Sequence, residues 1–433
     1  MDRELVIEEG ILLEPDQDPP FPKGRMLRKI ASRLEPFQYT VWNEFSPLAV
    51  KHKAINLGQG FPSFEPPEFV KSALRHTVTL PLNQYSRSQG HLPLVEEIAQ
   101  VYSRKHHRPI NPATEVLVGM GASELLLSAF LGLVDPGDQV VVFDPYFDIY
   151  IPQIRMAGGI PVAVPLVPPS AEESKWNIDF TRLEQAFNEK TRVFVLNTPL
   201  NPIGKVYTDE EMTKIAAILA KWPQVSIISD EVYEHIVFSG SLNSISNYGD
   251  LWNRTATLSS AGKIFSVTGW KTGWAVGGAE VIRKMAVAHQ WTVFCSNTPC
   301  QAAVAMALKQ AEEPYNGHLT YYKWLLSEYR RKLARLTTVL TTSKRVKLRT
   351  MQPEGGFFLL AEIVGEVPQQ YRANAALDFA FCRWVTEQYG VTAIPASAFF
   401  TKENEHLGER FARFALCKRD EEYEEVAARL ESQ

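Results

Sequence analysis

Two lysines stand close together in a segment made mostly of small and hydroxyl-bearing residues. Lys263 follows Ala261 and Gly262, and Lys271 comes eight positions later. A lysine amine attacks a carbonyl and forms a Schiff base when burial removes its proton near neutral pH. Small neighbours leave room for a flat ring beside such an amine. The alternative interpretation is a glycine-containing surface loop with two solvated lysines.

Groups that bind anions accompany the first of these lysines. The hydroxyls of Ser259, Ser260 and Ser266, together with Lys271, could hold a phosphate. Residues 121–123, Gly-Ala-Ser, open a predicted helix. The free N–H groups at the start of a helix attract anions. A Schiff-base lysine beside a phosphate cradle is the arrangement that pyridoxal phosphate requires.

Asp230 is a candidate partner for the nitrogen of such a ring. The ring withdraws electrons only while its nitrogen keeps a proton, and a buried carboxylate stabilises that charge. An aspartate after a strand is also a common helix N-cap, which is the alternative for Asp230. Asn201 and Tyr233 could both donate to the ring's phenolate oxygen. Asn201 precedes a proline, so it could equally be a turn residue.

Two further side chains are candidates for the same site. Phe147 could lie flat on the ring, although an ordinary core position would also explain it. Arg413 stands inside the apolar stretch 410–416. A buried guanidinium needs a partner, and a substrate carboxylate would bind it in a bidentate manner. The alternative is a salt bridge with an acid of the chain itself.

Short apolar strands alternate with helices from residue 115 to residue 278, which predicts a mainly parallel sheet covered on both faces. The expected strands are 115–119, 139–143, 160–164, 191–197, 225–229, 254–259 and 274–278, and the expected helices are 121–133, 180–188 and 208–221. Asp144, Asn201, Asp230 and Lys263 each come just after a strand. Ligands of open α/β sheets bind at that end of the strands.

The rest of the chain predicts a second, smaller domain. Helices are expected at 66–80, 92–108, 301–311 and 321–340. Residues 345–433 are expected to contain both strands and helices, in a pattern that differs from the alternation of residues 115–278. The expected division is a flexible arm at 1–24, an N-terminal part of the small domain at 25–68, a large cofactor-binding domain at 69–320 and a C-terminal small domain at 321–433.

Composition is that of a globular protein. The 433 residues are 45% hydrophobic and 22% charged, with a net charge of −4, so neither nucleic acid nor an anionic membrane is an expected partner. No apolar run reaches the length of a membrane span. The first 24 residues are acidic and do not resemble a signal or transit peptide, which predicts a cytoplasmic protein.

The four cysteines are too few and too scattered for a disulfide framework or a zinc site, and no spacing predicts a metal. Cys295, Cys300, Cys382 and Cys417 are therefore expected to be buried free thiols.

The chain resembles the class I/II aminotransferases of pyridoxal-phosphate fold type I. Within them it most resembles the kynurenine aminotransferase and glutamine transaminase group, whose members often also act as cysteine-conjugate β-lyases. The matching segments are 56–62, 83–90, 144–150, 188–206, 229–234, 259–274, 353–360 and 413–420. The resemblance implies an α/β fold with a mainly parallel seven-stranded sheet flanked by helices, a smaller α+β domain, and pyridoxal 5'-phosphate as cofactor.

The resemblance also implies roles for individual residues. Lys263 would form the Schiff base and move a proton, Asp230 would pair with the ring nitrogen, and Asn201 with Tyr233 would hold the phenolate oxygen. The other implied cofactor contacts are stacking by Phe147 and phosphate binding by Ala122, Ser123, Ser260, Lys271 and, from the neighbouring subunit of a homodimer, Tyr85. The implied substrate contacts are Arg413 and Asn201 at the α-carboxylate, and Gly60, Trp42 and the partner subunit's Phe294 around the side chain.

Three positions depart from the family pattern. Lys271 stands where many members carry arginine, Ser123 where relatives often have an aromatic residue, and Cys295 where a polar or imidazole group is common. The last two changes concern substrate preference, while the reaction type stays the same.

The implied reaction moves an amino group from an aromatic or long-chain L-amino acid, of kynurenine or glutamine type, to a 2-oxo acid with ping-pong kinetics. A β-lyase that cleaves a carbon–sulfur bond on the same site is the nearest alternative, and its products would be pyruvate, a thiol and ammonia. A catalytically inactive binding module is disfavoured because Lys263 is present. A nicotinamide dehydrogenase is disfavoured because no Gly-x-Gly-x-x-Gly turn follows the first strand.

Overall fold

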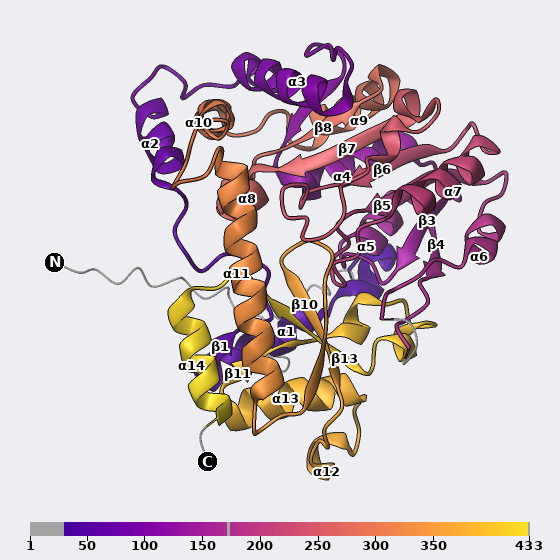
Figure 1. Ribbon diagram of the computed structural model, residues 1–433. Coiled ribbons are helices and arrows are strands. Elements are labelled where there is room, and N and C mark those ends of the chain that lie inside the picture. The colour runs from indigo at the N-terminus through magenta and orange to yellow at the C-terminus, as the bar shows by residue number, and fades with distance from the viewer. Residues whose placement is uncertain (1–29, 171–173, 432–433) are drawn as a thin grey trace, which may run out of the picture.

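The computed structural model describes residues 30–170 and 174–431 (Figure 1). The predicted arm at residues 1–24 lies outside these residues. The largest sheet has seven strands in the order β2-β8-β7-β6-β5-β3-β4. Its strands are β2 (Val116–Gly119), β3 (Gln139–Asp144), β4 (Ile160–Pro165), β5 (Thr191–Asn197), β6 (Ser226–Asp230), β7 (Thr255–Ser260) and β8 (Gly273–Gly277). Strand β8 runs opposite to the other six strands, so the predicted mainly parallel seven-stranded sheet is confirmed.

Helices cover both faces of this sheet because alternate side chains of each strand point to opposite sides. Val140 and Val142 of β3 pack in one core with α4 (Gly121–Leu133), α5 (Tyr150–Met156) and α9 (Ala279–Thr292). Val141 and Phe143 pack in another core with α6 (Phe180–Gln185) and α7 (Asp209–Ala220). The continuous apolar run of β3 is thereby buried on both sides.

The start of α7 shows how local sequence fixes these helices. The hydroxyl of Thr208 accepts a hydrogen bond from the Glu211 backbone N–H at 3.1 Å, and the Glu211 carboxylate accepts one from the Thr208 N–H at 2.9 Å. This reciprocal capping satisfies two donors that have no partner inside the helix. It fixes the point at which the chain leaves the loop after β5.

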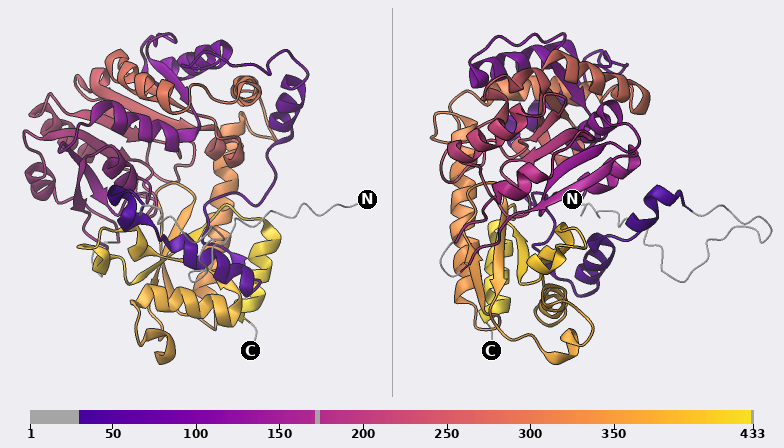
Figure 2. Two further views of the ribbon diagram at one scale, coloured as in Figure 1. Left: turned by 180° about the vertical axis from the view of Figure 1, so that it is seen from behind. Right: turned by 90° about the vertical axis from the view of Figure 1, so that its right-hand side faces the viewer.

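A smaller part of the molecule carries two further sheets. The antiparallel sheet β12-β13-β10-β9 contains β9 (Leu348–Met351), β10 (Phe358–Ile363), β12 (Ile394–Pro395) and β13 (Phe411–Ala415), and β1 (Ile55–Asn56) pairs in parallel with β11 (Val391–Thr392). Helix α1 (Val41–Lys51) packs on α13 (Leu377–Tyr389), and α11 (Tyr321–Thr342) packs on α14 (Asp420–Glu431). The N-terminal elements α1 and β1 thus lie among the orange and yellow C-terminal ones (Figures 1 and 2). The domain boundaries at residues 68 and 320 stay a prediction.

The remaining elements complete the cover of the large sheet and its loops. Helix α10 (Thr298–Gln310) packs against both α2 (Glu68–Thr77) and α3 (Leu92–His106). The short helices are α8 (Ala261–Ile264), α12 (Gln369–Arg372), η1 (Ser32–Phe37), η2 (Ile245–Asn247), η3 (Leu251–Arg254), η4 (Thr268–Trp270), η5 (Ala396–Phe399) and η6 (Glu405–Leu407). No helix among residues 30–170 and 174–431 is long and apolar enough to cross a bilayer.

The cysteine prediction is wrong for two of the four residues. All four are free thiols, but only Cys382 and Cys417 are buried, whereas Cys295 and Cys300 are half-buried. Cys295 lies in the loop between α9 and α10, and Cys300 lies in the first turn of α10. Cysteine is often buried, but this preference does not predict whether an individual cysteine near a surface loop is buried.

Candidate active site

A cavity of about 380 Å³ opens at the carboxyl ends of β3, β5, β6 and β7. The sequence-predicted residues that line it are Trp42, Gly60, Ala122, Ser123, Phe147, Asn201, Asp230, Tyr233, Ser260, Lys263, Lys271 and Arg413. They come from loops of the large sheet, from the N-terminal segment and from β13. The cavity therefore lies where the two parts of the molecule meet.

Lys263 lies on the single-turn helix α8 directly after β7. Its side chain is half-buried, and its Nζ donates a hydrogen bond to the Gly60 carbonyl at 3.2 Å. The same nitrogen lies 4.9 Å from the centre of the Phe357 ring. Burial lowers the pKa of Lys263 to about 8, so the uncharged form of this amine is far more populated near neutral pH than that of an ordinary lysine. An uncharged amine in a cavity is the nucleophile that the sequence predicts.

Asp230 is the last residue of β6 and is 3% exposed. Its carboxylate accepts a hydrogen bond from the Tyr150 hydroxyl at 2.6 Å. Burial raises the pKa of Asp230 to about 6, and the charge of Lys263 opposes that rise. A carboxylate with so little water around it favours a cationic partner, such as a protonated ring nitrogen.

Asn201 and Tyr233 line the same cavity as Asp230. The backbone N–H of Asn201 donates to the Asn197 side chain at 2.8 Å, and the Asn197 amide donates to the Asp230 carbonyl at 2.8 Å. The ring of Tyr233 packs edge-on against Phe357 with centroids 4.8 Å apart. The ends of β5 and β6 are thus fixed to each other at the level of the site.

An anion cradle lies at the start of α4. Gly121 has a φ of 73°, and a Cβ atom there would stand 3.3 Å from the Lys271 Nζ, so a side chain would intrude on the amine. Ala122 and Ser123 follow on the first turn of the helix, and Ser260 lines the same cavity. Free N–H groups at a helix start, an ammonium and hydroxyls together suit a phosphate.

Arg413 is buried in β13, with 2% of its surface exposed. It donates to the Asn201 side-chain oxygen at 3.0 Å and to the Gly58 carbonyl at 2.8 Å, while its Nε is buried without a partner. None of the ion pairs within residues 30–170 and 174–431 includes Arg413. The alternative of an internal salt bridge is therefore wrong for these residues, and an incoming carboxylate would find an unpaired guanidinium.

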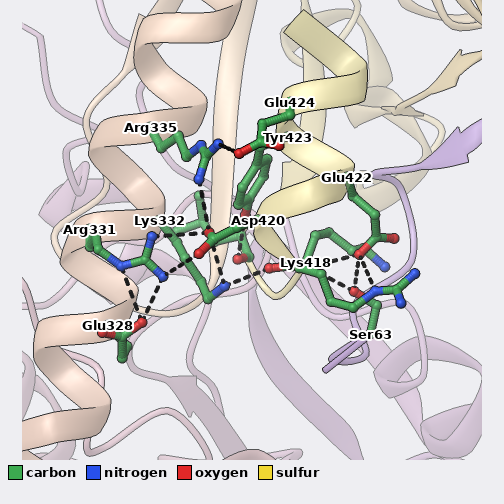
Figure 3. A network of polar contacts seen from close by, with 12 residues as sticks. Ser63, Glu328, Arg331, Lys332, Arg335, Lys418, Asp420, Glu422, Tyr423 and Glu424 are labelled. Carbon is green, nitrogen blue, oxygen red and sulfur yellow. Dashed lines mark hydrogen bonds and ion pairs between the residues drawn. The ribbon is translucent and has the colours of Figure 1, made fainter. Parts of the chain in front are cut away.

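Two buried lysines connect the segment 58–63 to the polar network that Figure 3 shows, in which Lys332, Lys418 and Ser63 take part. Residues 58–63 supply the two carbonyls that accept from Lys263 and Arg413. The Lys418 Nζ donates to the Phe61 carbonyl at 3.3 Å, and the Lys332 Nζ donates to the Lys418 carbonyl at 2.6 Å. Ser63 donates to Glu422. Helix α11, the end of β13 and α14 thereby fix the N-terminal wall of the cavity.

Two predicted residues and one strand-end residue lie elsewhere. Tyr85 is 83% exposed and packs edge-on against Phe294, with centroids 5.4 Å apart, outside the cavity of the same chain. Asp144 was expected to share the strand-end chemistry, but its carboxylate accepts from Thr401 and from the Asn404 amide instead. It ties the end of β3 to the loop before β13, away from the cavity lining.

The sequence interpretation did not include several residues that the structure brings to the site. Asp148 lines the cavity and accepts from the Trp42 indole at 2.8 Å, and Tyr150 holds Asp230. The strand-end rule that selected Asp144 would also have selected Asp148, four residues later. The ring centre of Phe358, on β10, lies 4.0 Å from Arg413 Cζ. No feature of the sequence pattern predicted that Phe358 would reach the site.

These groups fit pyridoxal phosphate. The cradle around Gly121 suits its phosphate, Asp230 suits its ring nitrogen, and Lys263 lines the same cavity with its amine pKa lowered to about 8. Ala122, Ser123, Ser260 and Lys271 would hold the phosphate, and Phe147, Asn201 and Tyr233 would surround the ring.

Comparison with known proteins identifies the same chemistry. The sequence profile described as Aminotransferase class I and II matches residues 52–430, which include every residue of the cavity lining except Trp42. A kynurenine–oxoglutarate transaminase of Dictyostelium discoideum is 40% identical over 414 residues, covering 90% of this chain and 93% of the relative. Human kynurenine–oxoglutarate transaminase 3 is 38% identical over 403 residues, covering 90% of this chain and 87% of the relative.

Solved structures agree with these relatives. Bna3p of Saccharomyces cerevisiae superposes with a TM-score of 0.86 at 35% identity, covering 93% of this chain and 98% of that one. The N-succinyldiaminopimelate aminotransferase of Mycobacterium tuberculosis gives a TM-score of 0.84 at 35% identity, covering 93% and 99%. Since sequence, fold and cavity agree over nearly the whole chain, the chain belongs to the class I and II aminotransferases, which depend on pyridoxal phosphate to move amino groups between amino acids and 2-oxo acids.

Proposed function

We propose that this aminotransferase takes its amino group from an aromatic or long-chain L-amino acid of kynurenine or glutamine type. One observation carries the proposal: Arg413 Cζ lies 5.5 Å from the centre of the Trp42 ring. A substrate whose carboxylate binds Arg413 would place its side chain beside this indole. The relatives named as kynurenine–oxoglutarate transaminases support the same donor class.

Each of the main residues around the cavity would have a separate role in the reaction. Bound pyridoxal phosphate supplies a ring that withdraws electrons from the substrate Cα when that carbon loses its proton. Lys263 would act as the base that takes the proton from the substrate Cα and as the acid that returns it. Asp230 would keep the ring nitrogen protonated, with Tyr150 holding its carboxylate in place. Arg413 and Asn201 would orient the substrate carboxylate.

A panel of donors tests the substrate proposal. Kynurenine, phenylalanine, glutamine, methionine and a cysteine S-conjugate are compared by kcat/KM with the wild type and with Trp42→Ala. We expect the indole to contribute roughly 1–3 kcal/mol to aromatic donors, so Trp42→Ala should lower their kcat/KM by about tenfold or more and leave methionine less affected. Equal losses of kcat/KM for all five donors would contradict the proposal. Release of pyruvate and a thiol from the conjugate would reveal the lyase reaction.

The pH dependence of cofactor uptake follows from the pKa of Lys263. An amine attacks only in its uncharged form, and the cofactor-stripped protein has its Lys263 pKa near 8. The rate at which this protein takes up added pyridoxal phosphate should therefore rise about tenfold per pH unit below pH 8 and level off above it. Absorbance of the cofactor measures the rate. A midpoint near 10.5, the ordinary value for lysine, would contradict the burial of this amine.

We also propose that the protein works as a homodimer in which Tyr85 and Phe294 reach the partner's cavity. Both are exposed aromatic residues, 83% and 43%, that contact each other outside their own site. Mixing a Tyr85→Phe chain with a Lys263→Ala chain tests this arrangement. If Tyr85 acts across the interface, mixed dimers contain one intact site and regain activity. If Tyr85 serves its own chain, mixing restores nothing.

A cytoplasmic location remains part of the proposal. The four free thiols suit a reducing compartment. Cell fractionation followed by immunodetection of the full chain tests this location, and a signal confined to organelles would contradict it.

A further inference from the structure

A buried cluster of charges lies behind the turn that carries Asp230 and Tyr233. Lys105, near the end of α3, contacts Glu231 at 2.9 Å and Glu234 at 2.6 Å. The side chains of the two glutamates are 0% and 4% exposed, and that of Lys105 is 25% exposed. None of the three lines the cavity, so the aminotransferase chemistry described above does not use them directly.

The spacing of the turn explains why these side chains point away from the site. Asp230 and Tyr233 are three residues apart and line the cavity, and Glu231 and Glu234 are also three residues apart and face Lys105. The Glu234 N–H donates to the Glu231 carbonyl at 2.9 Å, which closes the turn. Residues separated by one turn share a side, so fixing one pair orients the other.

The second oxygen of each carboxylate is also occupied. Glu231 accepts from Ser229 at 2.8 Å and from Ser244 at 2.7 Å. Glu234 accepts from Ser259 and from Tyr102, each at 2.5 Å. Ser259 precedes Ser260 of the phosphate cradle on β7, so this cluster joins the ends of β6 and β7. Both strand ends contribute side chains to the cofactor site.

Lys105 is the cation that balances these two buried carboxylates. Burial opposes the charge of Lys105, but Glu231 and Glu234 raise its pKa above the ordinary value. Burial also opposes the charge of Glu234, yet Lys105 helps hold the pKa of that carboxyl at about 2. Other ionisable groups that face the cluster include His106, His235 and Tyr102. Burial lowers the pKa values of both histidines, that of His235 to about 4. Near neutral pH the two histidines therefore supply no positive charge.

We propose that Lys105 is a positioning residue for the cofactor: by pairing with Glu231 and Glu234 it fixes the ends of β6 and β7 so that Asp230, Tyr233 and Ser260 face the cavity together. The inference rests on the cofactor roles proposed above for those residues. Without Lys105, two buried carboxylates would repel each other, and the turn would shift to reach water or protonate one of them.

Charge-balanced variants test this role in the purified holoenzyme. Lys105→Met removes the cation and leaves two buried negative charges. Adding Glu234→Gln returns the cluster to the wild-type net charge. The dissociation constant of pyridoxal phosphate is measured by dialysis and cofactor absorbance, and thermal unfolding is measured in parallel. We expect Lys105→Met to weaken cofactor binding by about tenfold or more, and the double variant to recover most of that loss.

The neighbouring residue supplies a matched control. Arg104 precedes Lys105 on α3 and pairs with Glu312 at 3.2 Å, with more than half of its side chain exposed at 58%. Arg104→Met should leave the cofactor dissociation constant unchanged, because an exposed ion pair contributes little. A loss in Arg104→Met as large as that in Lys105→Met would show that any charge removed from α3 has this effect, and would overturn the proposal.

The remaining outcomes also decide the question. Wild-type affinity in Lys105→Met overturns the proposal. A double variant no better than the single one overturns it too, since the lost packing of the lysine would then explain the defect. If Lys105→Met does not fold, recovery of a folded, cofactor-binding protein by Glu234→Gln supports the proposal, and failure of both variants to fold overturns it. Asp230→Asn in the same assay distinguishes a failure of the cofactor site from a failure of the Lys105 proposal. If this variant leaves cofactor binding and the cofactor spectrum unchanged, the proposed cofactor site is wrong.

Discussion

Replacing Lys263 with alanine is expected to abolish transamination. The variant loses the amine that attaches the cofactor and the base that moves the Cα proton, and such a base contributes up to about 10⁴-fold to a rate. We therefore expect kcat to fall by on the order of 10⁴-fold, with loss of covalently bound cofactor. Steady-state kinetics with an amino donor and a 2-oxo acid measures the fall in kcat. Borohydride reduction, followed by denaturation and filtration, measures the covalently bound cofactor.

The matched control for this variant is Lys214→Ala. Lys214 lies on α7 with half of its side chain exposed, and its partner is Glu210 on the same helix. Its loss should leave kcat within about twofold, since an exposed ion pair is worth little. A Lys263→Ala protein that keeps a hundredth or more of the wild-type rate would show that another group moves the proton.

Arg413→Met is expected to lower kcat/KM for amino donors by roughly 10²–10³-fold, because a substrate carboxylate would lose a buried, hydrogen-bonded charge partner. Methionine keeps the apolar volume between Phe358 and Phe399, which lie 4.0 Å and 4.3 Å from the guanidinium carbon. The fold should therefore persist, and the same loss should appear for every α-amino acid whatever its side chain. Initial rates across the donor panel measure the effect.

The neighbouring Arg410 provides the comparison. Its side chain is about half exposed at 53% and pairs with Glu362, outside the cavity. Arg410→Met should leave kcat/KM close to the wild type, and Arg413→Lys should fall between the two, because lysine keeps the charge but not the fork of donors. Unchanged kinetics in Arg413→Met would remove this residue from the substrate site.

Much of the sheet was predictable because its strands are short apolar runs with polar residues at their ends. The strand from Thr191 to Asn197 and the helix from Gly121 to Leu133 have the predicted bounds. The direction of β8 was not predictable from its apolar pattern, which fits a parallel or an antiparallel neighbour equally. Helix α5 was also missed, because its seven residues are too few to show a helical period.

The site was predictable where chemistry and strand position coincide, as for Lys263, Asp230 and Asn201. It was not predictable where a contact depends on the fold of distant segments. The hydroxyl of Tyr150 reaches Asp230 across 80 positions of sequence, and Phe358 meets Arg413 only because β10 pairs with β13. Asp144 shows the converse: it has the right residue type and place, but its carboxylate is already satisfied by Thr401.

The most direct test of this account is to find which residue carries the cofactor. Borohydride reduction of the holoenzyme fixes the cofactor to the lysine that holds it, and peptide mapping by mass spectrometry then locates the label. We expect a single labelled site at Lys263, whose amine lies in the cavity with a pKa lowered to about 8. A label on Lys271 or on a surface lysine, with Lys263 unmodified, would contradict it.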